Sequence, residues 1–126
     1  MNEDFVTYEL AVKLKEKGFR EKVNAYYGKH ENIFEIHPAL DMNDADYGAS
    51  APTISQVLKW LRNEKKIYIS ILPFATHSTI NKVAFYYLIN YNSTGETMEG
   101  IEQNVYCAEW KDAAFAGIEY VLDNLI

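Results

Sequence analysis

The stretch APTISQVLKWLR, residues 51–62, carries the clearest structural signal in the chain. The hydroxyl of Thr53 can accept a hydrogen bond from the start of a helix, and Gln56, three residues later, can bond back to the Thr53 N–H. Apolar residues then recur at the i, i+3, i+4, i+7 spacing of one helical face, at Ile54, Val57, Leu58 and Leu61. We therefore predict a capped helix from Thr53 to about Lys65, with Trp60 half covered at the edge of its apolar face.

Two further helices are predicted toward the ends of the chain. The first begins near Thr7, a capping residue, and ends at Gly18, where a glycine suits the left-handed conformation and Phe19 can fold back onto the last turn. The other runs from about residue 109 to 125, where apolar residues recur at helical spacing. Gly117 in its middle lacks a side chain, which favours a close approach of this helix to a sheet.

Four stretches are typical of β-strands, at Val23–Tyr27, Asn32–Ile36, Ile67–Leu72 and Lys82–Tyr91. Pro73 is expected to end the third strand, and a short fifth strand fits Glu102–Val105. Short connections within each pair imply antiparallel pairing, and amphipathic helices can cover one face of the resulting sheet. The order α-β-β-α-β-β-α predicts an α+β fold, a two-layer sandwich of three helices on an antiparallel sheet of four to five strands, in a single domain spanning 1–126.

Composition narrows the class of protein. The 126 residues are 48% hydrophobic and carry a formal charge of −6, which argues against nonspecific nucleic-acid binding because that requires an excess of Lys and Arg. The one cysteine, Cys107, excludes an intrachain disulfide and fits a reducing compartment. The acidic N-terminus has no apolar leader, and no apolar run is long enough to span a bilayer. We expect a cytoplasmic protein without membrane contact.

Residues 37–52 show no periodicity and are predicted to form one loop. At roughly 16 residues it exceeds the usual loop length, and such loops are often functional. Its polar groups His37, Asp41 and Asp46 are candidates for a ligand site. Asp41-x-Asn43 resembles the opening of a calcium loop, but apolar residues occupy later ligand positions. Because the histidines also lack the spacing of a zinc site, we predict no metal and a solvated acidic loop.

Catalytic motifs are missing from the sequence, since there is neither a glycine-rich phosphate loop nor a nucleophile turn. We therefore predict no catalytic residue and no cofactor. Tyr26, Tyr68 and Tyr86 fall on the strand faces opposite the predicted core. If these strands are neighbours, the three tyrosines form a docking face bordered by Trp60, because tyrosine and tryptophan are enriched where proteins dock. The alternative is that tyrosine is simply favoured in strands.

Three segments resemble a set of small uncharacterised proteins associated with phages and mobile elements of gut Bacteroidetes. The segments are APTISQVLKWLR with the following EKKI, the opening YELAVKLKEKGF and the closing AAFAGIEYVLDNLI. The pattern APT-x-x-Q-V-x-x-W-L-R carries most of the likeness. The resemblance implies a compact cytoplasmic α+β domain without known catalytic residues.

The leading functional hypothesis is a non-enzymatic binding or accessory protein of a phage or mobile element. It would act by contact with a protein partner or with itself, and would not bind nucleic acid directly. The alternative is a small enzyme or ligand-binding protein whose site lies under the 37–52 loop. A third hypothesis, inhibition of a nucleic-acid enzyme by acidic mimicry, requires the negative side chains to gather on one face.

Overall fold

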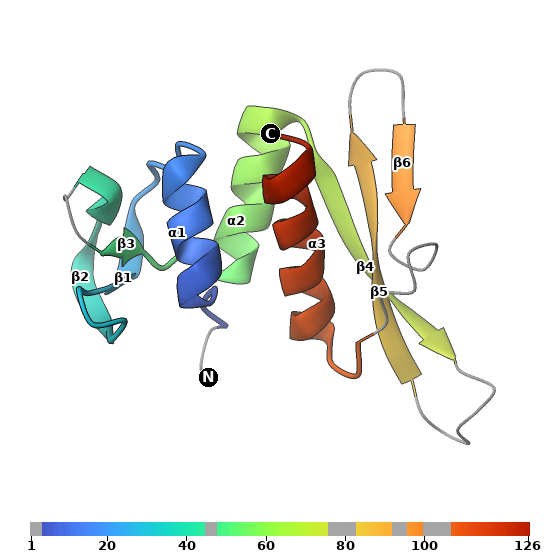
Figure 1. Ribbon diagram of the computed structural model, residues 1–126, viewed down its shortest axis with the longest axis horizontal. Coiled ribbons are helices and arrows are strands. Elements are labelled where there is room, and N and C mark those ends of the chain that lie inside the picture. The colour runs from blue at the N-terminus through green and yellow to red at the C-terminus, as the bar shows by residue number, and fades with distance from the viewer. Residues whose placement is uncertain (1–3, 45–47, 76–82, 92–95, 100–106) are drawn as a thin grey trace.

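The computed structural model describes residues 4–44, 48–75, 83–91, 96–99 and 107–126, and these form an α+β fold. Figure 1 shows the helices as a central layer with one small antiparallel sheet on each side of it. The α-helices of the described residues are α1 (Tyr8–Glu16), α2 (Ile54–Trp60) and α3 (Trp110–Asn124). None of them is long and apolar enough to cross a membrane.

Helix α1 begins and ends as its sequence predicts. The Thr7 hydroxyl accepts a hydrogen bond from the Leu10 N–H at 3.3 Å. Gly18 adopts a left-handed φ of 90°, and the Phe19 N–H donates to the Leu14 carbonyl at 3.0 Å. This closure turns the Phe19 ring into the core, where it is fully buried.

Helix α2 has the predicted capping box. The Gln56 N–H donates to the Thr53 hydroxyl at 3.2 Å, and the Thr53 N–H donates to the Gln56 side-chain oxygen at 2.9 Å. Beyond Trp60 the helix widens into a π-helical turn over Leu61–Lys65 and ends at Lys66, which has a φ of 57°. The predicted end near Lys65 is thus confirmed, but the last turn is not α-helical.

The first sheet contains β1 (Val23–Tyr27), β2 (Ile33–Leu40) and β3 (Ala49–Ser50), in the order β2-β1-β3. The prediction of one long loop over 37–52 is therefore wrong, because β2 extends to Leu40 and a 3-10 turn, Met42–Asp44, precedes β3. The segment returns along the free edge of β1, where the Ala51 N–H donates to the Ala25 carbonyl at 2.9 Å. Backbone pairing of this kind leaves no periodic signal in so short a stretch.

The second sheet contains β4 (Tyr68–Ala75), β5 (Val83–Tyr91) and β6 (Glu96–Glu99), in the order β4-β5-β6. Pro73 does not end β4, which corrects the prediction. An edge strand tolerates proline because the missing N–H faces away from the sheet. Strand β6 is not among the predicted strands, and the possible strand Glu102–Val105 lies outside the described residues.

The predicted single sheet under three helices is also corrected, because the two hairpins do not join. Each hairpin instead recruits a different third strand, β3 for the first sheet and β6 for the second. Alternation and turn residues specify which strands form a hairpin, but they do not specify whether two hairpins share an edge. The α+β class itself is confirmed.

One hydrophobic core connects both sheets through the helices. Its fully buried members include Leu14 of α1, Val23 of β1, Val57 of α2, Ile89 of β5 and Ile118 of α3. Burying a side chain of this kind is worth about 1.5–3 kcal/mol. Helix α3 lies close against the second sheet at Gly117, where an added Cβ would stand 3.1 Å from the Tyr87 ring, as the small residue predicts.

Candidate binding surfaces

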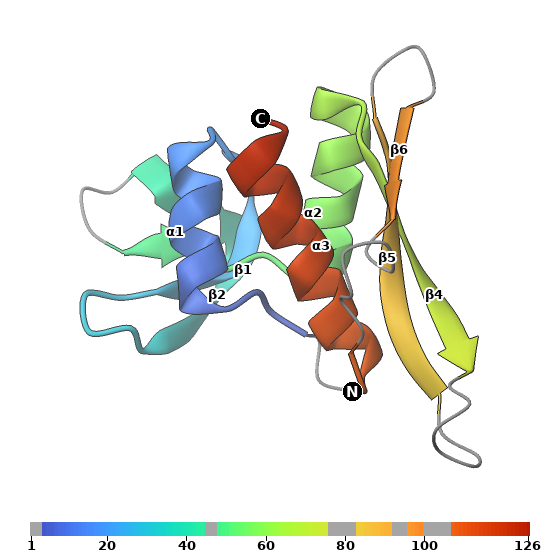
Figure 2. The ribbon, with the colours of Figure 1, turned by 45° about the vertical axis from the view of Figure 1, so that its right-hand side comes forward.

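The predicted tyrosine patch is not assembled as one surface. Tyr26 lies in β1 of the first sheet, whereas Tyr68 and Tyr86 lie in β4 and β5 of the second sheet. The helical layer separates the two sheets, as Figures 1 and 2 both show. The prediction that these strands are neighbours is therefore wrong for Tyr26 and correct for the other two.

The side of the second sheet that faces away from the helices is partly apolar and carries no charged side chain on its two long strands. Register pairs Tyr68 with Asn90, Ser70 with Leu88 and Leu72 with Tyr86, and these six positions alternate with the buried Tyr87 and Ile89. Tyr68 is 48% exposed. Leu72, Tyr86 and Leu88 are half-buried. We call these six residues the outer face.

One feature of the sequence points to the outer face. Tyr86 and Leu88 are apolar or aromatic on the side of β5 opposite its core residues, so the strand is hydrophobic on both sides. A strand with only one covered face normally alternates between apolar and polar residues. This departure indicates Leu88, which the predicted site lacks. Leu72, also missing from the predicted site, lies opposite Tyr86 in the register.

The free edge of β4 is equally uncharged. Within the described part of the chain β5 is its only paired strand, and the eight residues YISILPFA contain no Asp, Glu, Lys or Arg. Natural edge strands usually carry charges or other devices that discourage pairing with another strand. In β4 the only residue that discourages such pairing is Pro73, near the end of the strand.

A second, smaller aromatic surface lies on the first sheet. Tyr26 stacks on Phe34, with ring centroids 5.4 Å apart, and Phe34 is 47% exposed. Strand β2 is interrupted by a bulge, since register shifts between Val23 and Ala25 on its partner strand. Such a bulge twists an edge and disfavours its pairing with another strand.

Trp60 belongs to neither sheet surface. It is 5% exposed, which corrects the prediction of a half-covered ring at the border of the tyrosines. Phe19 contacts it edge to face, with centroids 5.2 Å apart, and the Lys65 ammonium lies 5.5 Å from its ring centroid. Phe19 covers the ring because the C-terminal closure of α1 brings that side chain against α2.

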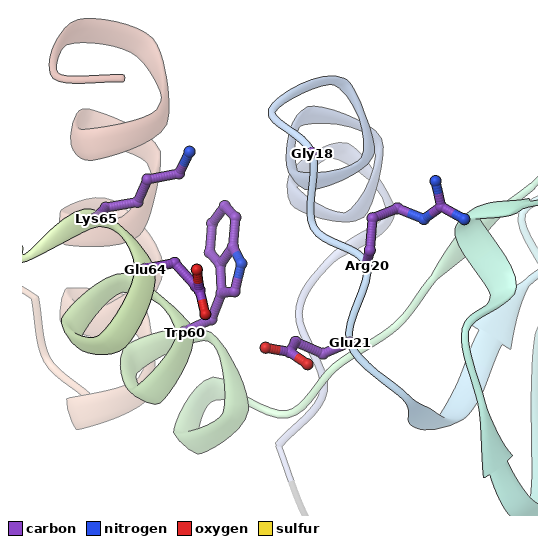
Figure 3. A pocket seen from close by; sticks show the side chains of 6 residues that line it. All are labelled: Gly18, Arg20, Glu21, Trp60, Glu64 and Lys65. Atoms are coloured by element: carbon purple, nitrogen blue, oxygen red, sulfur yellow. The ribbon is translucent and has the colours of Figure 1, made fainter.

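A polar groove opens beside Trp60, between α2 and the segment that follows α1. A hollow of about 430 Å³ is lined by Arg20, Glu21, Lys22, Gln56, Lys59, Trp60 and Asn63. A second hollow of about 300 Å³ shares three of these residues and adds Gly18, Glu64 and Lys65 (Figure 3). We call the two hollows together the Trp60 groove.

The acidic residues at the 3-10 turn form ion pairs with Arg20. Asp41 accepts from Arg20 Nε at 2.7 Å, and Asp44 accepts from an Arg20 terminal nitrogen at 3.1 Å. Both carboxylates, Asp41 foremost, raise the pKa of Arg20. Buried Asn43 donates to the Phe19 carbonyl at 2.7 Å and accepts from the Ser50 N–H at 2.8 Å. These contacts anchor the turn, so the expectation of a merely solvated loop is corrected for Asp41 and Asn43, whereas the side chain of Asp44 is 84% exposed.

The remaining candidates of the 37–52 segment do not assemble into a site. His37 lies exposed on β2, and Asp46 lies outside the described residues. Among the residues that the structure describes, no cluster of three His, Cys, Asp or Glu side chains is arranged to hold a metal. Cys107, on the far side of the molecule, pairs with Phe85, and burial raises the pKa of its thiol, with a smaller contribution from Asp112.

Comparison with known proteins finds no match, neither to a family model nor to a curated protein nor to a solved structure.

Proposed function

We propose that this protein is a non-catalytic binding protein that acts by protein–protein contact through the outer face and the free edge of β4. The observation that carries the proposal is a partly apolar face, uncharged on β4 and β5, on a sheet whose other face packs against the helices. Contiguous apolar surface on a soluble protein marks interaction sites. The resemblance to phage and mobile-element proteins suggests the setting, an accessory factor of such an element.

The partner that fits this surface best is a second copy of the chain. With a formal charge of −6, two copies repel one another over most approaches, and the repulsion is smallest where uncharged surfaces meet. The uncharged edge of β4 is such a surface. Symmetric pairs are the commonest oligomers, because one self-complementary patch then serves both partners.

The backbone of β4 determines how two copies would pair. Phe85, opposite Pro73, directs its N–H and carbonyl to Cys107, at 2.7 and 2.9 Å, and therefore not to β4. The backbone groups of Pro73 therefore face the open edge of β4. Because the direction of the N–H and carbonyl groups alternates along a strand, those of Ile71 and Ile69 face the same edge. Antiparallel pairing about Ser70 then sets Ile69 opposite Ile71 of the second copy. Pro73, which lacks an N–H, falls near the end of the paired region.

Charge placed on the symmetry axis tests this arrangement. Ser70 is exposed, and in a Ser70→Lys variant the two lysines would meet each other across the axis. Ser55→Lys is the matched control, because Ser55 is an exposed serine on α2. Molar mass is measured by light scattering after size exclusion, over protein concentrations from about 10 µM to about 1 mM.

We expect the mass of the wild type and of Ser55→Lys to rise from 14.5 kDa toward twice that value, while Ser70→Lys stays at 14.5 kDa. Mixing Ser70→Lys with Ser70→Glu should restore the pair, because opposite charges then meet. A wild type that stays monomeric throughout, or a Ser70→Lys variant that pairs as well as Ser55→Lys, would contradict the proposal.

The alternative, an enzyme or ligand-binding protein with a site under the 37–52 segment, has less support. The carboxylate of Asp41 and the amide of Asn43 are already engaged in hydrogen bonds that hold the turn. His37 lies exposed on an edge strand, so it is not enclosed with them.

A further inference from the structure

The indole N–H of Trp60 is a hydrogen-bond donor without an acceptor among the described residues, although the side chain is 5% exposed. In Figure 3 its nitrogen lies on the side of the ring that faces the segment carrying Gly18, Arg20 and Glu21, across the groove. Among the described residues no buried side-chain nitrogen or oxygen lacks a hydrogen-bond partner, so the unpaired indole N–H of Trp60 reaches solvent in the groove. The groove is where an acceptor can approach.

The charges around the larger hollow favour a negatively charged acceptor. Its lining holds three cationic side chains, those of Arg20, Lys22 and Lys59, against the single carboxylate of Glu21. Arg20 is already engaged by Asp41 and Asp44, which leaves the two lysines. A local excess of positive charge in a chain of formal charge −6 is an attractive site for an anion.

A cation is a poorer fit to the same groove. Glu21 and Glu64 point into the smaller hollow, but no third His, Cys, Asp or Glu joins them in the described part of the chain. The Trp60 N–H would also present its positive end to a cation. An oxygen anion instead satisfies both the indole donor and the lysines.

The backbone adds a separate indication. The π-helical turn Leu61–Lys65 directly follows Trp60 and carries Asn63, Glu64 and Lys65, which line the groove. Single π turns within helices occur frequently at functional sites. At about 430 Å³ the larger hollow is also within the range of small-ligand sites, roughly 300–1,000 Å³.

We propose that the Trp60 groove binds an oxyanion, a carboxylate or a phosphate group, which accepts a hydrogen bond from the Trp60 indole N–H and is balanced by Lys22 and Lys59. The group belongs either to an acidic peptide or to a small phosphorylated molecule. This site is separate from the outer face, because none of the six outer-face residues lines either hollow.

Nuclear magnetic resonance observes this donor directly. The chain has two tryptophans, so an ¹⁵N-labelled sample gives two indole N–H signals, one from Trp60 and one from Trp110, which is 41% exposed and serves as an internal control. Inorganic phosphate and a tetraglutamate peptide are titrated separately at constant ionic strength. We expect a saturable shift of the Trp60 signal with at least one probe, and the stronger probe identifies the source of the oxyanion.

Variants separate the site from general charge attraction. Lys59→Gln should weaken binding of that probe about tenfold, because a charge-assisted contact is lost. Lys111→Gln, the matched control beside Trp110, should leave it unchanged. Trp60→Phe keeps an aromatic ring against Phe19 but removes the donor, and calorimetry should show a loss of about tenfold as well.

Three results would overturn the proposal. These are the absence of a saturable Trp60 shift with both probes, equal shifts of the two indole signals, and an unchanged affinity in both Lys59→Gln and Trp60→Phe. None of them bears on pairing through β4, which is measured by molar mass.

Discussion

Two glycines adopt the left-handed backbone conformation in different surroundings. Gly18 has a φ of 90° and open space where a Cβ would be, whereas Gly48 has a φ of 76° and a Cβ there would collide with the Tyr27 carbonyl. Gly48 also offers its carbonyl to the Lys15 ammonium at 3.0 Å, which connects the start of β3 to α1. The left-handed conformation alone costs a non-glycine residue about 1–2 kcal/mol.

We predict that Gly48→Ala destabilises the protein more than Gly18→Ala does. Gly18→Ala should cost about 1 kcal/mol from backbone strain alone. Gly48→Ala adds displacement of backbone that pairs β1 with β3, for a total of about 2–4 kcal/mol. Urea unfolding of both variants measures the difference. If both variants lost the same free energy of unfolding, the backbone at the β1–β3 contact would shift to accept the added Cβ without an energetic penalty.

The sequence predicts the role of Gly18 but not that of Gly48. Gly18 could be predicted as a helix end because Phe19 follows it and the apolar pattern stops there. Gly48 has no such signal, since its constraint comes from Tyr27, far away in the sequence. The buried position of Trp60 was missed for the same reason, because the ring that covers it belongs to α1.

At the scale of the element, α2 depends on the two hydrogen bonds of its capping box. We predict that Thr53→Val, which keeps the shape but removes the hydroxyl acceptor, lowers the free energy of unfolding by about 1 kcal/mol. Thr53→Ser, which keeps the acceptor and loses a methyl group, is the control and should lose less. Urea midpoints at constant m-value measure both. A Thr53→Ser loss equal to that of Thr53→Val would show that the methyl group, and not the cap, matters.

Elements with local signals were predictable, and their long-range pairing was not. Caps, apolar periodicity and glycine ends located all three helices to within a few residues. The strands of each hairpin were also predicted, but the predicted ends of β2 and β4 were too early, because residues 37–52 lack periodicity and Pro73 was expected to end its strand. Pairing of β3 with β1 depends on backbone hydrogen bonds between segments about 25 residues apart, which composition does not encode. The outer face was predicted only through Tyr68 and Tyr86.

At the scale of the molecule, the central helices make the two sheets parts of one packed structure. Lys13 of α1 donates to Asp123 of α3 at 3.0 Å, but this contact is exposed and contributes little. The connection instead lies in the shared core, where Leu14 of α1 and Ile118 of α3 belong to the same buried cluster. Because both sheets pack on that layer, loss of its packing should affect them together.

We therefore predict that the protein unfolds as a single cooperative unit, as a single domain requires. Leu14→Ala, a core truncation in α1, should lower the free energy of unfolding by about 2–5 kcal/mol. Hydrogen exchange measures the free energy of opening at each amide. In the Leu14→Ala variant this free energy should fall by the same amount for the globally protected amides of β1 and of β5, although β5 lies in the far sheet. If only the β1 amides lost protection, the two sheets would be separate folding units. In that case the core that connects them would contribute to packing without coupling their stability.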